Sequence, residues 1–374
     1  LAIKKRLLYK GKVIGITGSA GKTTFKETLS FFLKNNNIIS YSKKSFNNEL
    51  GVLISLLNLN LKSKYAIFEI GTNNFGEIKY LTKLVKPEQI FITNILSTHL
   101  ENFKTKNNIG KEKSDIFISK YNNQREKLFL FVSNKEEKNI FKRAKKEKKM
   151  KVIRIDNMSK KYFIKNIISN KNNYEITFSI NKKITKIKNK SIVMFRLINL
   201  LFCYAFFDEN KMNINIISNK QKYLKPVDGR GLEHLIRINK KTVKIIDESY
   251  NANPDTMSQS IDYFGSLKED SNKKVLILGN MNELGKNSQK MHTELLNKID
   301  KINFKTTILC GEFFRTSIKK LLKPKNEFIY LDNKDKIMKY LQTKVHNDDI
   351  IMIKCSNATE VNMLAKDLLK KKVN

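Results

Sequence analysis

The sequence is poor in cysteine, and its three cysteines lie far apart in the chain. Cys203, Cys310 and Cys355 form no C-x-x-C pair, so the sequence indicates neither a disulfide framework nor a zinc site. No apolar run reaches the roughly 18 residues that a membrane helix needs, and we expect no membrane span. The basic N-terminal stretch also lacks the apolar core and the cleavage site of a signal peptide. A reducing cytoplasm fits these absences.

Acidic residues are scarce as well. The chain has 35 Asp and Glu against 73 Lys and Arg, which gives a formal net charge of +38. Such a charge could neutralise the phosphates of a nucleic acid. However, lysine and asparagine are spread along the whole chain, whereas nucleic-acid-binding proteins cluster their basic residues. We therefore ascribe the charge to composition and expect no nucleic-acid partner, with a non-catalytic, nucleic-acid-binding P-loop protein as one alternative.

Only four prolines occur, and none falls inside a strand or helix that the pattern predicts. Short apolar runs alternate with helical patterns, which is typical of layered α/β structure. The stretch with Pro226, Gly229 and Gly231 breaks the alternation, and we place a domain boundary there, between residues 1–226 and 227–374. The expected strands are residues 13–16, 66–70, 90–95, 128–132 and 152–155, a hairpin over 174–187, and, after a helix over 195–207, residues 243–246, 275–278, 307–309, 328–330 and 350–353.

The stretch T-G-x-x-G-K-T-T, residues 17–24, follows the first expected strand and opens a helix. It lacks the first glycine of the general P-loop pattern. Gly18 and Gly21 still let the backbone approach an anion, and the helix N-terminus adds its positive dipole. Lys22 can reach the β- and γ-phosphates, and Thr23 can place its hydroxyl on Mg²⁺. The sequence therefore predicts a nucleotide phosphate site.

Further magnesium ligands should lie at the carboxyl ends of strands beside this loop, because ligands of open α/β sheets bind there. Glu69 ends one expected strand, and His99 comes just after another. Each could instead be an ordinary surface glutamate or loop histidine. Their position next to an accepted P-loop favours the metal role.

These stretches together resemble the Mur ligase superfamily, and most closely its MurF branch. The superfamily's P-loop lacks the same first glycine. FNNELGV, EIGTNNFGEI and TNILSTHLENF followed by KEKSDIF look like middle-domain segments of that superfamily, and GRGLE, DESYNANPDTM and GNMNELGKNSQKMH look like its C-terminal signatures. SYNANP is the most specific of these and points to the MurF branch. The resemblance extends over nearly the whole chain from Val13 onward.

The resemblance implies a P-loop-type central α/β domain with a mainly parallel sheet, followed by a Rossmann-like α/β C-terminal domain. It implies an ATP-dependent ligase that phosphorylates the terminal carboxylate of UDP-N-acetylmuramoyl-tripeptide. The amine of D-alanyl-D-alanine would then attack this acyl phosphate, in the synthesis of a peptidoglycan precursor. Positioning and charge neutralisation carry most of such chemistry. We expect a monomeric cytoplasmic enzyme that uses ATP and Mg²⁺.

Individual roles follow from the resemblance, residue by residue. Lys113 matches the lysine that the superfamily carries as a carbamate, although a solvated lysine in a basic run is the alternative. The asparagines at positions 47, 48, 251 and 253 could equally be turn residues. The catalytic set is Lys22, His99, Lys113 and Arg230; the nucleotide-binding set is Gly18, Ser19, Ala20, Gly21, Lys22, Thr23, Thr24, Asn199, Arg230, Glu248 and Asn251; the metal set is Thr23, Glu69, His99 and Lys113; and the substrate set is Asn47, Asn48 and Asn253.

Some features depart from the family pattern. The family has an N-terminal domain that grips the UDP end of the substrate, and this chain begins directly before the P-loop domain, so we expect that domain to be missing or on another chain. Asn280 stands in place of an acid in GNMNELG, and KCSNA, residues 354–358, replaces K-G-S-R-x. A sister ligase that shares the ATP site, such as a folylpolyglutamate synthase or another Mur enzyme, is the second alternative. SYNANP argues against it.

Overall fold

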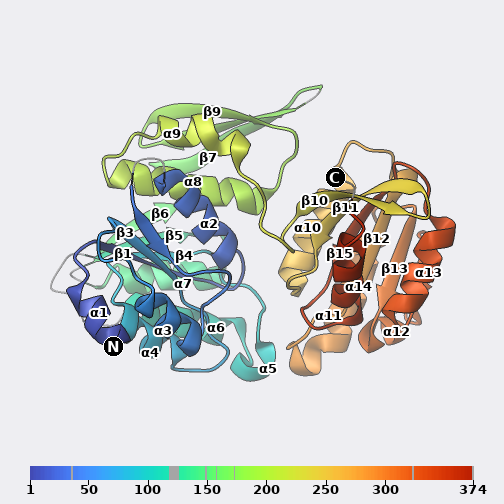
Figure 1. Cartoon of the computed structure of the whole chain (residues 1–374), viewed down its shortest axis with the longest axis horizontal. Helices are drawn as coiled ribbons and strands as arrows, with labels where there is room; N and C mark the ends of the chain where they lie inside the picture. The colour runs from blue at the N-terminus through green and yellow to red at the C-terminus, as the bar shows by residue number, and fades with distance from the viewer. Residues whose placement is uncertain are drawn as a thin grey trace. The chain divides into compact units, whose positions relative to one another are not determined.

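The chain divides into two compact units in the computed structural model, which describes residues 1–34, 37–117, 126–147, 150–156, 158–171, 173–321 and 324–372 (Figure 1). The first unit comprises Leu1–Leu96 and Asn102–Leu224, and the second comprises Ser97–Glu101 and Lys225–Asn374. The short stretch Ser97–Glu101 therefore groups with the second unit, although its neighbours on both sides in the sequence belong to the first. Each unit has a sheet and a core of its own.

The first unit is built on a six-stranded sheet in which every neighbouring pair of strands is parallel. In spatial order the strands are β2 (Ile39–Tyr41), β3 (Tyr65–Glu69), β1 (Lys12–Thr17), β4 (Gln89–Ile92), β5 (Glu126–Phe131) and β6 (Met150–Ile155). The central strands β1, β3 and β4 are almost completely buried. Strands covered on both faces are nearly continuous apolar runs, which is why they are recognisable in the sequence.

Two helices, α2 (Lys22–Leu33) and α8 (Met194–Glu209), pack together over this sheet. Phe25 of α2 and Phe202 of α8 contact Phe91 of β4, whose ring stacks on Phe129 of β5 at 4.4 Å between centroids. This aromatic cluster fixes α2, and with it the loop that opens α2, against the sheet. The other helices of this part of the chain are α1 (Ala2–Leu8), α3 (Glu49–Leu57), α4 (Glu77–Val85), α5 (Leu100–Phe103), α6 (Lys106–Ser114), α7 (Lys135–Ala144) and α9 (Asn215–Lys220).

A separate three-stranded antiparallel sheet belongs to the same unit. It consists of β7 (Tyr162–Ser169), β8 (Tyr174–Ile180) and β9 (Lys183–Asn189). It packs on α8, where Phe178 meets Tyr204. The β8–β9 hairpin turns through Asn181 and Lys182, both with positive φ, as a tight two-residue turn requires.

The second unit contains another six-stranded sheet, covered by five α-helices in the described part of the chain. Its strand order is β10 (Leu232–Ile238), β11 (Lys241–Glu248), β15 (Ile350–Lys354), β12 (Lys274–Gly279), β13 (Thr306–Cys310) and β14 (Phe328–Tyr330), with only β10 antiparallel to its neighbour among these. The helices are α10 (Pro254–Ser266), α11 (Ser288–Ile299), α12 (Glu312–Ile318), α13 (Lys334–Lys344) and α14 (Glu360–Leu369). Two parallel-rich α/β units in succession confirm the predicted fold class.

The strands that the sequence did not predict are β2, β7 and β10. Polar and apolar residues are mixed along them and most positions are at least partly exposed, so a search for continuous apolar runs does not find them. The change of unit between Leu224 and Lys225 falls close to the expected boundary, whose functional meaning stays a prediction.

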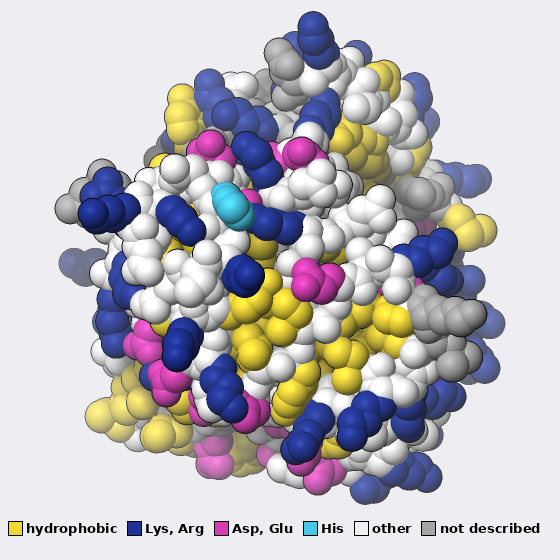
Figure 2. All heavy atoms as spheres, turned by 90° about the vertical axis from the view of Figure 1, so that its right-hand side faces the viewer, with side chains coloured by type: hydrophobic (Ala, Val, Ile, Leu, Met, Phe, Trp, Pro, Cys, Tyr) yellow, Lys and Arg dark blue, Asp and Glu magenta, His cyan; other side chains and the backbone are white. Residues whose placement is uncertain are grey.

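No helix within the described residues combines the length and the apolar character that a membrane crossing needs. On the molecular face shown in Figure 2, lysine and arginine side chains lie scattered among neutral and acidic ones and do not form one continuous stripe. The interpretation of the charge as a matter of composition stays a prediction.

Candidate active site

The loop between β1 and α2 has the backbone conformation that its glycines predict. Gly18 has a φ of 145° and Gly21 a φ of 78°, values that residues with a Cβ atom rarely adopt. A Cβ on Gly18 would lie 1.9 Å from Thr93 Oγ1, so no larger residue fits at that position. Lys22 reaches back across the loop and donates to the carbonyl oxygen of Gly18 at 2.9 Å.

The chain directly after β4 braces this loop. Ser19 N–H donates to Asn94 O at 3.0 Å, and Ala20 N–H donates to Asn94 Oδ1 at 2.9 Å. Thr93 Oγ1 donates to Ala20 O at 2.7 Å, and Leu96 N–H donates to Ser19 Oγ at 2.9 Å. Sequence reasoning gave Thr93 and Asn94 no role. The signal that could have found them is a pair of polar residues placed immediately after a buried strand.

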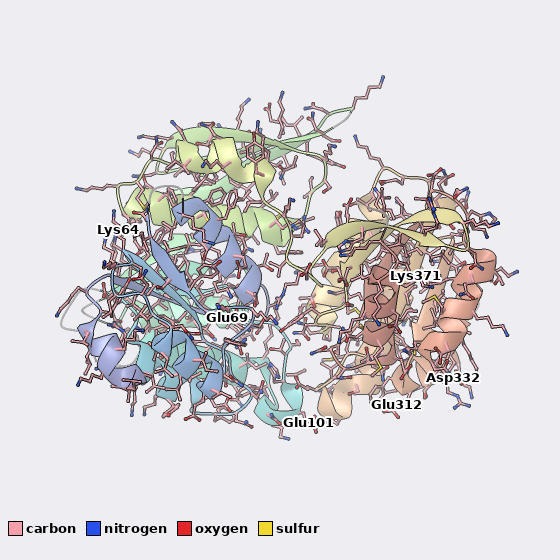
Figure 3. The ribbon with its side chains drawn as sticks, in the orientation of Figure 1. Lys64, Glu69, Glu101, Glu312, Asp332 and Lys371 are labelled. Carbon is pink, nitrogen blue, oxygen red and sulfur yellow. The ribbon has the colours of Figure 1, made fainter. Side chains whose placement is uncertain are left out.

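Glu69 is the meeting point of two of the predicted residue sets. It ends β3, and its side chain is almost completely buried (labelled in Figure 3). Thr23 Oγ1 donates to Glu69 Oε2 at 2.7 Å, and Asn47 Nδ2 donates to Glu69 Oε1 at 2.8 Å. Glu69 is thus hydrogen bonded both to the other metal candidate, Thr23, and to the substrate candidate Asn47. Asn48 instead caps α3 by accepting from Gly51 N–H at 2.9 Å, which fits its alternative role as a turn residue.

Lys113 lies on α6 with only 2% of its surface exposed, so it is not a solvated lysine. Burial and the neighbouring ammonium group of Lys22 hold the pKa of Lys113 well below its ordinary value, and Glu112 opposes this shift only in part. Glu112 is engaged elsewhere, because it accepts the N–H groups of Gly76 and Ile78 at the start of α4. Burial and the charge of Lys22 thus disfavour the ammonium form of Lys113.

Asn199 and Thr24 lie on the two helices that pack together over the sheet. Asn199 on α8 is 5% exposed, and its Nδ2 group has no hydrogen-bond partner among the described residues. A buried amide donor without an acceptor costs free energy, so this atom is suited to an acceptor on a ligand. Thr24 lies in the first turn of α2, and its carbonyl accepts from Thr28 Oγ1.

In the second unit, Arg230 belongs to a turn that a buried aspartate organises. Asp247 accepts Gly229 N–H at 3.1 Å and Ser249 Oγ–H at 2.6 Å, and so ties the turn to the end of β11. The guanidinium of Arg230 lies over the ring of Tyr250, 4.3 Å from its centroid, which is a cation–π contact. Sequence reasoning missed Asp247 and Tyr250, although both stand in the quoted DESYNANPDTM stretch.

Glu248 and Lys354 form an ion pair at 3.0 Å at the ends of β11 and β15. Lys354 Nζ also lies 3.4 Å from the carbonyl oxygen of Asn251, to which it donates. Asn253 caps α10 by accepting Thr256 N–H at 3.0 Å. Its Nδ2 atom is buried without a hydrogen-bond partner among the described residues, so the turn role of Asn253 leaves one donor for a ligand.

His99 adopts a left-handed backbone conformation with a φ of 51°. Its Nδ1 atom lies 2.5 Å from Glu283 Oε2, and Glu283 also has a positive φ, of 64°. The hydrogen bond from His99 lowers the pKa of the Glu283 carboxyl group. Two neighbouring residues in a conformation that costs about 1–2 kcal/mol each are typical of functional segments. No cluster of three or more His, Cys, Asp and Glu side chains suited to a metal occurs among the residues that the structure describes.

The predicted site residues thus fall into two groups. Lys22, Thr23, Asn47, Glu69 and Lys113 come together in the first unit, where charge interactions or hydrogen bonds join them. The remaining candidates of the first unit lie along the phosphate loop, on α8 and at the start of α3. His99, Arg230, Glu248, Asn251 and Asn253 lie in the second unit.

The sequence matches the Mur ligase middle domain family over residues 16–207 and the family of Mur ligase, glutamate ligase domains over residues 234–357. The chain belongs to the Mur ligase family. The middle-domain match contains the whole of the phosphate loop and Glu69, and the second match contains Glu248 and Lys354.

Curated relatives of this Mur ligase include UDP-N-acetylmuramoyl-tripeptide–D-alanyl-D-alanine ligases from several bacteria. The Rickettsia prowazekii enzyme is 29% identical, with 97% of this chain and 79% of the relative covered. The Buchnera aphidicola subsp. Baizongia pistaciae enzyme is 30% identical, with 96% and 75% covered.

Solved structures share the fold of this Mur ligase. MurF from Acinetobacter baumannii matches with a TM-score of 0.85 at 23% identity, covering 99% of this chain and 79% of the other. The MurF ligase from Thermotoga maritima in complex with ADP matches with a TM-score of 0.83 at 24% identity, covering 99% and 82%. Folylpolyglutamate synthase from Mycobacterium tuberculosis also matches, with a TM-score of 0.71 at 11% identity, covering 98% and 94%.

Proposed function

We propose that this chain is an ATP-dependent ligase that joins D-alanyl-D-alanine to UDP-N-acetylmuramoyl-tripeptide. The observation that carries the proposal is the phosphate loop whose helix-opening Thr23 is hydrogen bonded to the strand-end carboxylate Glu69. The curated relatives named above carry this activity in their names, and SYNANP fits the same branch. Among the described residues we find no comparable built site in favour of a nucleic-acid-binding role.

Each unit carries residues with a proposed role toward the nucleotide. Residues 18–24 would hold the phosphates, and the orphan amide of Asn199 would meet an acceptor on the adenine. In the second unit, Glu248 would bind the ribose hydroxyls and Arg230 would neutralise the γ-phosphate, with Asn251 shaping the same side. A guanidinium stacked on an aromatic ring suits this task because it is planar and always charged.

Magnesium fits the residues present around Glu69. A threonine hydroxyl and a carboxylate, 2.7 Å apart, are oxygen donors of the kind that Mg²⁺ prefers. The ion would neutralise charge on the phosphates. His99 would bind a second ion through Nε2, because Glu283 engages its Nδ1. Burial lowers the pKa of Lys113, and its amine could add CO₂ with loss of one proton and present a carbamate oxygen to a metal ion.

The residues then divide the work of the reaction. Lys22 and Arg230 would offset the negative charge that builds up as the tripeptide carboxylate attacks the γ-phosphorus. Asn47, Asn48 and Asn253 would orient the muramoyl peptide and the incoming dipeptide so that its amine faces the acyl phosphate. Holding reactants in this way supplies much of the rate in such reactions. We further propose that the enzyme acts in the cytoplasm as a monomer.

Phosphate release from ATP with Mg²⁺ tests the proposal. Release is measured with UDP-N-acetylmuramoyl-tripeptide in the presence of D-alanyl-D-alanine, of L-glutamate as a substitute acceptor, or of no acceptor. We expect release that needs both the tripeptide and the dipeptide, and none from Lys22→Ala. Release with L-glutamate but not with D-alanyl-D-alanine would replace the proposal with a sister ligase. Normal turnover by Lys22→Ala would contradict the role of the phosphate loop.

A further inference from the structure

Lys26 is a buried lysine to which the proposed reaction gives no part. It lies on α2, one turn beyond Lys22, and its side chain has no exposed surface. Burying an ammonium group is costly unless neighbouring groups accept its hydrogen bonds. The neighbours that hold this ammonium therefore show what Lys26 contributes.

The ammonium of Lys26 is anchored to the segment that follows β2. Its Nζ donates to the carbonyl oxygen of Ser42 at 2.6 Å and to that of Lys44. The same atom lies 3.2 Å from Glu27 Oε1 and 4.0 Å from Glu69 Oε2. Lys44 has a positive φ of 47°, a strained conformation for lysine. The hydrogen bond on its carbonyl holds the turn in that conformation.

Residues 42–48, which we call the 42–48 loop, wrap around the residues of the candidate site. Ser42 Oγ accepts the backbone N–H of Glu69 at 3.2 Å, and Ser45 Oγ lies 3.1 Å from Thr23 Oγ1. Asn47 Nδ2 donates to Glu69 Oε1 at 2.8 Å. The loop thus contacts the metal candidates at three points, and Lys26 fastens its first half to the helix that opens from the phosphate loop.

We propose that Lys26 is a positioning residue that fixes the 42–48 loop against α2 and so presents Asn47 beside Glu69 on the muramoyl-peptide side of the site. Lys26 itself contacts neither the nucleotide nor the peptide. This inference rests on the proposed function for the identity of the ligand, but the loop contacts stand without it. Replacing the ammonium leaves two backbone carbonyls without their donor and frees the loop.

Lys26→Met and Lys26→Gln test the proposal, with Lys274→Met as the matched control. Lys274 is a buried lysine of the second unit that likewise donates to two backbone carbonyls, those of Gly265 at 3.0 Å and Leu267 at 2.7 Å. Its replacement therefore reports what the loss of such a pair costs away from the site. The glutamine variant keeps an N–H donor for one carbonyl but removes the charge, so it serves if the methionine variant does not fold.

Three measurements are made on the full chain: hydrogen exchange over residues 42–51, calorimetric binding of UDP-N-acetylmuramoyl-tripeptide, and binding of ADP without metal. In Lys26→Met we expect the loop to exchange at least about ten-fold faster and the peptide affinity to fall about ten-fold, because unpaired carbonyls let the loop open. ADP affinity should stay within about two-fold, since the phosphate loop keeps its brace at Asn94. The exchange rate and peptide affinity of Lys26→Gln should lie between those of Lys26→Met and the wild type. Lys274→Met should match the wild type in all three measurements.

Wild-type exchange and peptide affinity in a folded Lys26 variant would overturn the proposal. Equal effects in Lys26→Met and Lys274→Met would do so too, because they would reduce Lys26 to a general stabilising contact. If the wild-type chain binds no muramoyl peptide, the proposed function fails. The exchange rates of the 42–48 loop then still decide the role of Lys26.

Discussion

Glu137 offers a quantitative test of how the segment after β4, which braces the phosphate loop, is itself held in place. It is completely buried on α7, and it belongs to a capping box with Asn134. Its Oε1 accepts Ile95 N–H at 3.0 Å. Its Oε2 accepts Ser133 N–H and Ser133 Oγ–H, both at 2.8 Å, and Asn134 N–H at 3.1 Å. This carboxylate therefore ties the chain after β4 to the start of α7.

The magnitude follows from counting the donors left behind. Glu137→Ala deprives three backbone N–H groups of their acceptor, and each unpaired buried group costs about 1–3 kcal/mol. Water can reach the N–H groups of Ser133 and Asn134 at the helix start more easily than the N–H group of Ile95. We therefore expect a total loss of about 3–5 kcal/mol in the free energy of unfolding. Glu137→Gln keeps one acceptor but turns an amide N–H₂ toward a donor, which should cost about 1–3 kcal/mol.

The same substitutions should weaken nucleotide binding. Ile95 lies between Asn94 and Leu96, and these two residues hydrogen bond to the phosphate loop. Urea unfolding measures the stability loss, and calorimetry measures the affinity for ADP. Glu136→Gln is the matched control on the same helix, with an expected change within about 0.5 kcal/mol. If Glu137→Ala unfolds at the same urea concentration as the wild type, the count of hydrogen bonds has no energetic meaning and the reasoning is refuted.

Four further predictions concern three residues of the site. Gly18→Ala should abolish ADP binding in calorimetry, because its Cβ would meet Thr93 Oγ1 at 1.9 Å; retained affinity would contradict the geometry of the loop. Lys113→Met should be more stable than the wild type in urea at pH 7, and this difference should shrink toward pH 10. The pKa of Lys113 is lowered in the folded state, so the unfolded wild-type chain binds more protons and wild-type stability rises with pH. A stability difference that does not change with pH would contradict this. Lys113→Ala should lose ligase activity that short carboxylic acids partly restore, and full activity without rescue would remove its catalytic role. Tyr250→Phe should keep the KM for ATP and Tyr250→Leu should raise it several-fold, because only an aromatic ring keeps the cation–π contact with Arg230. Equal KM values in the two variants would show that the stacking contributes nothing to ATP binding.

The sequence predicted the buried parallel strands and the phosphate loop because both leave local patterns. A strand such as β4 is a continuous apolar run, and the loop needs glycine at Gly18 and Gly21. The partly exposed strands β7 and β10 leave no such pattern, since only some of their positions face a core. The sequence alone therefore identifies the sheet centres better than their edges.

Tertiary partners of the site residues were beyond the sequence for a different reason. Asn94 contacts Ala20, 74 positions away, and Lys26 and Asp247 contact Ser42 and Gly229, 16 and 18 positions away. Nothing in the local spacing of these three residues encodes those contacts. The roles of Lys113 and Arg230 came from the resemblance and remain predictions. What the structure adds for Lys113 is a physical setting, burial beside Lys22, in which the expected chemistry of a neutral amine is reasonable.

Buried charge is the useful filter in a chain with so many lysines. An exposed lysine costs little, so a composition that favours lysine can place one at almost any surface position. A buried charge must be matched by hydrogen bonds or an opposite charge, or it destabilises the fold. In the first unit Asp156 is buried and pairs with Arg154 of β6. The other buried charged residues described there are each on, or bonded to, a segment that leads to the phosphate loop or to Glu69, and they are Lys26, Glu69, Glu112, Lys113 and Glu137. Replacing a surface lysine with glutamine should therefore have little effect on ADP affinity. Replacing any of Lys26, Glu69, Glu112, Lys113 and Glu137 with an isosteric neutral residue should measurably change nucleotide or peptide binding.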